Sequence, residues 1–496
     1  MSEKQKLDKK NTSQINKFLS KGELQEILGV KKKENFFAHV DISSIVFFRI
    51  IFGLLMFIDV IIYFSKIDRY WIIPKNHFYY WPFDFLTPLP GQGMYLLFIL
   101  MGMLSIFIIV GFLYRISMIL FCISFTYIFL LEQTRYLNHF YLIILVSFIM
   151  IFIPANTSAS FDSKIFKKIR SETCPVWSLW ILRFIIMLPY FFGGIAKLNS
   201  DWIHGEPLRM WLTKNSDAFS LGSYFHHESI VLLMAYSGLL LDLLIIPALL
   251  FKKTRTVGFL IITLFHVLNS QLFIIDIFPW FMIAATTLFF NTNWLRKYIN
   301  FFSRNNNAWP QILVSKEKLL APKIITQKNK IILVLLFILI VTQLFLPLRH
   351  FLFSGNVLWT EEGQKFAWQM KLRTKQVIAF YIIKDKNSGK VYDINVNEYL
   401  KPWQREAMED KPNLIWQFGQ IVKKDFKKRN IDISFFANIN ASLNGRKFQP
   451  LIDTTFDLTS VPYEIFSHSK WVVSLKTPLN ERLNENLEKN TTNVYE

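Results

Sequence analysis

Long apolar segments separated by short polar loops fill the first 350 residues. Each is about the length that a helix needs to cross a membrane. They lie near residues 43–64, 94–112, 115–131, 138–153, 177–196, 229–251, 257–274, 276–291 and 331–347. The seventh and eighth are short, which allows a tilted, broken or re-entrant course. The pattern predicts a multi-pass α-helical membrane protein with about nine spans.

From about residue 349 the pattern becomes that of a soluble α+β domain. Val377–Ile383 and Val391–Val396 flank a turn at 387–389, which predicts a hairpin. Residues 397–428 have a mostly helical pattern, broken at Pro402 and Pro412.

A further strand is predicted over Asp432–Leu443, because part of this segment alternates between apolar and polar residues. It runs into Asn444-Gly445, a typical type I′ turn pair. The chain is therefore expected to divide into a basic cytoplasmic segment, a transmembrane catalytic domain, an extracytoplasmic α+β domain and a flexible tail, at residues 1–42, 43–348, 349–476 and 477–496.

The net charge of +20 does not indicate nucleic-acid binding, because the basic residues gather beside the spans. Contact with anionic lipid and the positive-inside rule explain this placement more simply. With nine spans and a cytoplasmic N-terminus, all the basic clusters fall on the cytoplasmic side and the C-terminal domain lies outside. These clusters are residues 4–33, 164–170, 252–255 and 296–330. The polar, Lys-rich first 40 residues lack a signal-peptide core, so the first span is expected to be an uncleaved anchor.

Lys197 is the first candidate for chemistry. It ends the apolar run 182–196, where a membrane helix meets its polar edge. Partial desolvation there disfavours the ammonium form and makes a free amine available as a base. The structural alternative is a lysine that extends to the lipid headgroups, as lysines at helix ends commonly do.

Further polar residues are expected at the same depth: Asn138, His139, Asn199, Asp201, Trp202, His266, Asn269 and Gln271. His139 can instead cap a helix, and His266 with Asn269 can form an interhelical hydrogen-bonded pair. If the groups converge, they form a polar pocket walled by Phe, Leu and Ile. Such a pocket suits a lipophilic substrate with a polar head, such as a quinone.

Other chemistries find little support. The sequence has no Gly-rich phosphate loop, no HExxH and no GxSxG. His226-His227-Glu228 lacks a third spaced histidine, so no metal is predicted. Asp242, inside an apolar span, is either a pocket residue or a hydrogen-bonded helix contact.

Six strings resemble the vitamin K-dependent γ-glutamyl carboxylases and the wider group with a horizontally transferred transmembrane domain. They occur in the same order and cover both the membrane and the soluble parts. They are FLLEQTRYLNHFYL (129–142), FFGGIAKLNSDW (191–202), FHVLNSQLF (265–273), QLFLPLRHFL (343–352), WTEEGQKFAWQM (359–370) and NGRKFQPLID (444–453).

The resemblance implies an enzyme that converts protein glutamate to γ-carboxyglutamate and forms vitamin K epoxide. In this family the lysine of the KLxxDW context, here Lys197, deprotonates the reduced vitamin K hydroquinone. Oxygenation then provides a base strong enough to remove a γ-proton from a peptide glutamate, and the carbanion adds CO2. O2 and CO2 are thus co-substrates, and the partners are a Glu-containing protein, membrane lipid and a lipid-soluble quinone.

The resemblance also assigns residues. His139 matches a catalytic histidine that steadies the reactive anion. The quinone contacts are expected from Asn138, Asp201, Trp202, His266, Asn269 and Gln271. Residues of outer regions associated with the glutamate substrate are Trp359, Trp368, Met370, Arg446 and Phe448.

The Lys-, Asn-, Ile- and Phe-rich composition indicates a bacterial inner-membrane protein, for which menaquinol is the expected cofactor. The chain departs from the animal carboxylases in three respects. Ala196 replaces a second lysine, the extracytoplasmic disulfide is absent, and the sequence after Met370 differs. These departures concern propeptide recognition more than the quinone chemistry. Two alternatives stay open: a quinol oxygenase without peptide carboxylation, and a non-enzymatic membrane scaffold or transporter.

Overall fold

The computed structural model describes residues 36–214, 216–218, 222–273, 275–297 and 326–479. Three sequence predictions therefore lie wholly or largely outside the described residues. They are the basic segment 1–42, the basic cluster 296–330 and the tail 477–496.

Each of the nine predicted spans contains a helix within the described part of the chain. These helices are α3 (Ser43–Phe64), α4 (Gly93–Val110), α5 (Tyr114–Leu131), α6 (Asn138–Phe152), α8 (Val176–Ala196), α11 (Glu228–Leu250), α12 (Arg255–Leu272), α13 (Phe278–Thr286) and α15 (Gln327–Phe345). By length and composition, six of the helices described can cross a membrane: α3, α4, α5, α8, α11, and α15 with its continuation to Leu352. The multi-pass helical prediction is confirmed.

Two of the remaining apolar helices are short. α6 covers Asn138–Phe152, and α13 continues as a 3-10 turn to Phe289. At 1.5 Å per residue they measure roughly 22 and 18 Å, less than the hydrocarbon core of about 30 Å. Local thinning of the bilayer or the adjoining loops must complete these crossings.

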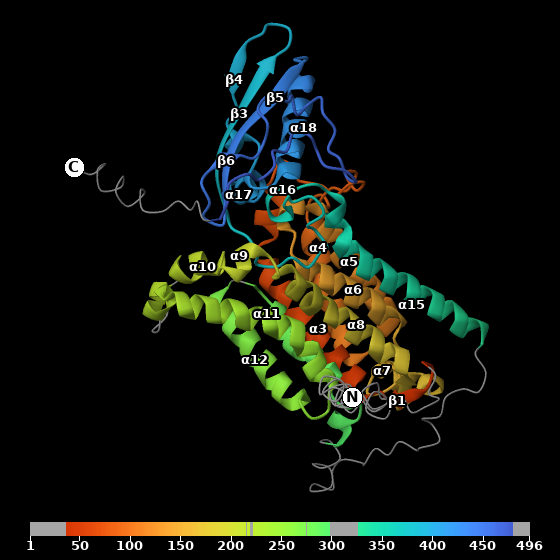
Figure 1. Cartoon of the computed structure of the whole chain (residues 1–496). Coiled ribbons are helices and arrows are strands. Elements are labelled where there is room, and N and C mark those ends of the chain that lie inside the picture. Colours follow the sequence, from red (N-terminus) through yellow and green to blue (C-terminus); the bar gives the residue numbers. More distant parts are fainter. Residues whose placement is uncertain (1–35, 215, 219–221, 274, 298–325, 480–496) are drawn as a thin grey trace, which may run out of the picture.

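Apolar side chains cover the outside of the bundle as well as its interior. On α4, Leu96, Ile99 and Met103 are exposed, whereas Phe98 and Met101 are buried. A helix that is apolar on all sides fits a lipid environment and would be unfavourable in water. Figure 1 shows α15 along the flank of the bundle, where most of its side chains are exposed to the surroundings.

Short elements close the two ends of the bundle. At one end β1 (His39–Asp41) pairs antiparallel with β2 (Thr173–Pro175), close to α7 (Phe161–Ile165). At the other end α9 (Ser200–Ile203) and α10 (Leu208–Lys214) lie beneath the C-terminal domain (Figure 1). The remaining short helical turns are η1 (Asp68–Ile72), η2 (Gln133–Arg135), η3 (Lys167–Ile169), η4 (Ser216–Ala218), η5 (Gly222–His226), η6 (Thr287–Phe289), η8 (Leu346–Leu352) and η9 (Val396–Glu398).

The C-terminal domain is a four-stranded antiparallel sheet in the order β4-β3-β5-β6, with helices beside it. Its elements are α16 (Val357–Thr360), β3 (Lys375–Asp385), β4 (Val391–Asp393), α17 (Pro402–Glu409), α18 (Pro412–Lys428), β5 (Ile433–Leu443) and β6 (Gln449–Pro450). Phe418 of α18 packs edge-on against Phe435 of β5, with ring centroids 5.6 Å apart. The predicted α+β domain is confirmed.

Turn chemistry explains several boundaries in this domain. Pro402 and Pro412 are the first residues of α17 and α18, where a missing N–H costs no helical hydrogen bond. Asn444 and Gly445 have φ angles of 52° and 78°, as a type I′ turn requires. The turn brings Arg446 back towards the bundle.

Candidate functional site

The end of α8 that faces the C-terminal domain carries Lys197. Its amine forms an ion pair with the carboxylate of Asp242 on α11. Both side chains are at least nine-tenths buried, with 10% and 7% of their surface exposed. The Lys197 Nζ also lies 5.2 Å from the centre of the Trp202 ring, a cation–π distance. A buried ion pair thus lies at the end of the apolar bundle that faces the C-terminal domain.

Two glycines let α11 approach closely enough for this pair. A Cβ on Gly194 would lie 2.7 Å from Leu243 Cδ2 and 3.2 Å from the Leu243 nitrogen. A Cβ on Gly193 would lie 3.3 Å from Asp242 Oδ2. Since Gly193 is one helical turn before Lys197, these small residues place Asp242 beside the lysine.

One further turn down α8, Tyr190 meets His266 of α12. The Tyr190 hydroxyl and His266 Nε2 are 2.7 Å apart and hydrogen-bonded. The other ring nitrogen of His266, Nδ1, is buried, and no residue that the structure describes forms a hydrogen bond with it. Tyr190 and Lys197 lie on one side of α8, so the two polar pairs follow one another along the same helix.

His139, at the start of α6, is the second buried histidine. Its ring stacks on Phe278 of α13, with centroids 5.6 Å apart and an interplanar angle of 30°. Phe278 also meets the His266 ring edge-on at 6.0 Å, so it lies between the two histidines. The Nε2 atom of His139 is buried and lacks a hydrogen-bond partner within the described part of the chain. Neighbouring Asn138 accepts a hydrogen bond from the Tyr136 hydroxyl at 2.9 Å.

A segment of the C-terminal region completes this area. Trp368 is fully buried in the core of the bundle, 5.2 Å from the Tyr141 ring, and its Nε1 has no hydrogen-bond partner among the residues described. A Cβ on Gly193 would lie 3.6 Å from Met370 Cε and 3.9 Å from the Trp368 carbonyl oxygen. Trp368 and Met370 are thus neighbours of the Lys197–Asp242 pair.

The structure places other residues from the sequence analysis away from this centre. Asp201 binds Arg446 and Asn444 of the C-terminal domain. Trp202 donates its Nε1 hydrogen to the Ala235 carbonyl, and only its ring faces Lys197. Gln271 is exposed, and Asn269 is half-buried.

Two of the residues expected at the substrate lie within the C-terminal domain. Trp359 is a core residue whose Nε1 donates to the Val473 carbonyl at 2.6 Å. Phe448 is half-buried beside the 444–445 turn. Neither is among the neighbours of Lys197 given above.

Sequence reasoning left Asp242 undecided and missed Tyr190. The signal for Asp242 was a single carboxylate inside an apolar span, which is costly without a cation. Tyr190 gave no signal, since a tyrosine in an aromatic-rich span is unremarkable. A second polar chain was also missed: the Tyr63 hydroxyl donates to Asp276 at 2.9 Å and accepts from Arg135 at 3.0 Å.

Two family models match the chain. Residues 37–294 match the model of the HTTM domain, and residues 328–478 match the lumenal domain of the vitamin K-dependent gamma-carboxylase. The chain belongs to the vitamin K-dependent gamma-carboxylase family. No solved structure matches it. Both halves of this carboxylase-family protein contribute to the buried area, through Lys197 and Asp242 on one side and Trp368 and Met370 on the other.

The polar groups of the area fit the reduced vitamin K that the carboxylase family implies. A hydroquinone has a flat aromatic ring, two hydroxyl groups and an apolar tail. The aromatic walls and the partnerless atoms His139 Nε2, His266 Nδ1 and Trp368 Nε1 suit such a molecule. Among the described residues, no cluster of three or more His, Cys, Asp or Glu side chains offers a metal site.

Proposed function

We propose that this protein is a membrane γ-glutamyl carboxylase. It converts protein glutamate to γ-carboxyglutamate with O2, CO2 and reduced vitamin K, menaquinol being the expected form. Vitamin K epoxide is the second product. The observation that carries the proposal is the buried Lys197–Asp242 pair, on the helix that also carries the Tyr190–His266 hydrogen bond.

Lys197 serves as the base in this proposal. In the reacting state Lys197 carries a neutral amine; its Nζ accepts a proton, and the ion pair with the Asp242 carboxylate then stabilises the ammonium that results. The Trp202 ring face at 5.2 Å adds to this stabilisation. Burial matters because the attraction between opposite charges is much stronger in a water-poor site than in water.

The hydroquinone, when bound, supplies an acidic hydroxyl and, with O2, the oxidative energy that makes the γ-proton of glutamate removable. His139, His266 and Trp368 provide nitrogen atoms that orient polar groups at the base of the site. The aromatic rings of Phe278 and Tyr141 exclude water from it. A γ C–H of a carboxylate is too weakly acidic for Lys197 to ionise directly, so the coupled chemistry is required.

The enzyme is further proposed to be a bacterial inner-membrane protein with a cytoplasmic N-terminus and an extracytoplasmic C-terminal domain. The Lys-rich segment 164–170 supports this orientation, because it adjoins α7 at the end of the bundle away from the C-terminal domain (Figure 1). Cytoplasmic loops are enriched in Lys and Arg.

The test uses purified full-length protein with reduced menaquinone or vitamin K, oxygen, labelled bicarbonate and a Glu-rich peptide. Quinone epoxide and peptide-bound label are measured in the same tube. Both products are expected from the wild type, and neither from Lys197→Ala. Lys386→Ala removes an exposed lysine of the β3–β4 turn and serves as the matched control.

The two alternatives give other results in the same assay. Epoxide without peptide-bound label would indicate a quinol oxygenase. The absence of both products from well-folded wild-type protein would indicate a scaffold or transporter. Wild-type turnover by Lys197→Ala would overturn the assignment of the base.

A further inference from the structure

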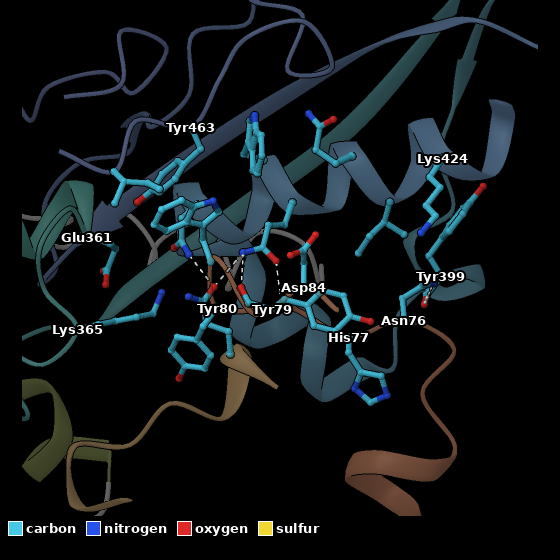
Figure 2. A pocket seen from close by; sticks show the side chains of 18 of the residues that line it. Asn76, His77, Tyr79, Tyr80, Asp84, Glu361, Lys365, Tyr399, Lys424 and Tyr463 are labelled. Atoms are coloured by element: carbon cyan, nitrogen blue, oxygen red, sulfur yellow. Dashed lines mark hydrogen bonds between the residues drawn. The ribbon is translucent and has the colours of Figure 1, made fainter. Parts of the chain in front are cut away.

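A cleft of about 1100 Å³ separates the C-terminal domain from the loop at residues 75–84. Its walls are α18, this loop, residues 461–465 and the segment 361–366. Figure 2 shows Lys365 and Glu361 at one end of the cleft and Lys424 and Tyr399 at the other. The cleft is distinct from the buried area around Lys197, and its size suits a segment of polypeptide or another large ligand.

The floor of the cleft is rigid and polar. Gln417 of α18 exchanges two hydrogen bonds with the backbone of Tyr79, at 3.0 and 3.1 Å. Its amide also donates to Gln133 at 3.0 Å, and Asn413 donates to the same oxygen at 3.0 Å. These bonds tie the C-terminal domain to the bundle and hold the two walls apart at a fixed distance.

The end of the cleft near Glu361 carries positive charge without a matching acceptor. Arg349 donates one hydrogen bond to the Lys365 carbonyl at 3.0 Å and lies 5.7 Å from the centre of the Phe366 ring, while its buried Nε has no hydrogen-bond partner among the described residues. The Lys365 amine lines the cleft and makes no hydrogen bond or ion pair with any residue that the structure describes. We call this pair of residues the inner cation pair.

The Glu361 carboxylate, close to this pair, already binds two other cations. Glu361 binds Arg373 at 2.6 Å and Lys375 at 2.8 Å, through different oxygen atoms. Both of its oxygens therefore have cationic partners.

Burial lowers the pKa of Lys365 to about 7, and the charges of Lys411, Arg349 and Arg373 act in the same direction, against Glu361. An anionic ligand would stabilise the charged form of a lysine in such a place.

The backbone between Lys365 and Met370 links the cleft to the buried area. Lys365 and Phe366 line the cleft, whereas Trp368 and Met370 lie beside Gly193 and Asp242. Phe366 and Trp368 have φ angles of 66° and 57°, a left-handed conformation that bulky residues rarely adopt. The rings of Phe366 and Trp368 both pack on Tyr141, with centroids 4.8 and 5.2 Å apart from it, so the segment joins the cleft to the core of the bundle.

We propose that the inner cation pair, Lys365 and Arg349, binds an accessory carboxylate of the substrate polypeptide, one other than the glutamate that is carboxylated. This inference rests on the proposed function, since it assigns a polypeptide to the cleft. Because one short segment separates the two sites, the accessory acidic residue lies within a few residues of the reacting glutamate. The enzyme thereby selects clustered acidic residues over isolated ones.

The occupant is a polypeptide rather than bicarbonate for reasons of size and lining. A bicarbonate ion needs a small fraction of about 1100 Å³. The remaining walls offer aromatic side chains and amides, among them Tyr80, Trp416 and Gln420, which suit a peptide backbone and its side chains.

The test measures binding directly, without quinol or oxygen. Fluorescence anisotropy follows a labelled peptide with two neighbouring glutamates, and a second peptide in which one is glutamine, on full-length protein in detergent. The wild type is expected to bind the two-glutamate peptide at least tenfold more tightly. Lys365→Met is expected to abolish that preference, Lys365→Arg to keep it, and Lys386→Met to leave it unchanged.

Equal affinity of the wild type for both peptides would overturn the proposal, and so would an unchanged preference in a folded Lys365→Met variant. Displacement of the two-glutamate peptide by millimolar bicarbonate alone would assign the pair to that ion and also overturn it. If Lys365→Met does not fold, the comparison of the two peptides' affinities for the wild type decides the matter. Because no turnover is measured, failure here is distinguishable from failure of the carboxylase proposal.

Discussion

Asp201 and Arg446 join the two halves of the protein through a bidentate ion pair. Two guanidinium nitrogens of Arg446 each lie 2.6 Å from a different carboxylate oxygen of Asp201. Both side chains are more than nine-tenths buried, with 6% and 5% of their surface exposed. Asp201 lies in α9, four residues after Lys197 at the end of α8, so this contact holds the segment after the lysine against the C-terminal domain.

Removing one partner of this pair is expected to be costly. Asp201→Asn leaves the Arg446 guanidinium buried without an anion, which costs about 3–5 kcal/mol. A clear fall in Tm is expected in detergent, together with a loss of epoxidation. Lys386→Gln, which removes an exposed pair with Asp432, is expected to change stability by no more than about 1 kcal/mol. Equal Tm values for the two variants would refute the coupling role.

The helix contact at Gly194 gives a second prediction. Gly194→Ala places a Cβ 2.7 Å from Leu243 and pushes α11 away from α8, at a cost of about 1–3 kcal/mol. The variant is expected to lose epoxidation because Asp242 moves away from Lys197. Gly238→Ala is the control, since the nearest atom to its Cβ would be 3.7 Å away. Wild-type activity in Gly194→Ala would show that close approach of the helices is dispensable.

The partnerless nitrogen of His139 predicts that stability and activity respond differently. His139→Leu removes a buried polar atom without a partner, so stability should change by no more than about 1 kcal/mol. Epoxidation is nevertheless expected to fall strongly. His266→Phe should instead lower Tm, because the buried Tyr190 hydroxyl loses its bond. A large loss of stability in His139→Leu would mean that the histidine is structural.

Peptide binding should depend on pH through Lys365. Its pKa is lowered to about 7, so the amine is protonated below that pH and neutral above it. Affinity for the two-glutamate peptide is expected to fall as pH rises from 6 to 9, with a bound carboxylate shifting the midpoint upward. The charged groups that act on the Lys365 amine are Glu361, Lys411, Arg349 and Arg373. Lys365→Arg should flatten the profile, and an unchanged slope in that variant would contradict the assignment.

Much of the architecture could be predicted from local sequence patterns. Apolar segments long enough for a bilayer became helices, because backbone groups in lipid can be satisfied only within the segment or in a closed barrel. Asn444-Gly445 formed its turn because both residues tolerate positive φ. Proline positions marked the starts of α17 and α18 rather than breaks within one helix.

Less of the site could be predicted from the sequence, because the residues that contact one another there are far apart along the chain. Lys197 was singled out by its position at a helix end, but its pairing with Asp242 depends on the packing of two helices. Asp201 lies in the same motif and binds Arg446, which residue spacing could not indicate. Lys365 gave no sequence signal. It stands out only in the structure, where its amine has no hydrogen-bond or ion-pair partner among the described residues.

The segment from Glu361 to Lys371 has a thermodynamic consequence. It touches the cleft with some side chains and the Lys197 area with others, and several of its residues hold left-handed φ angles that only a fixed surrounding maintains. A polypeptide in the cleft and a hydroquinone in the bundle would then favour the same arrangement of this segment. Each would raise the affinity of the protein for the other by the same factor, since coupling free energies are reciprocal.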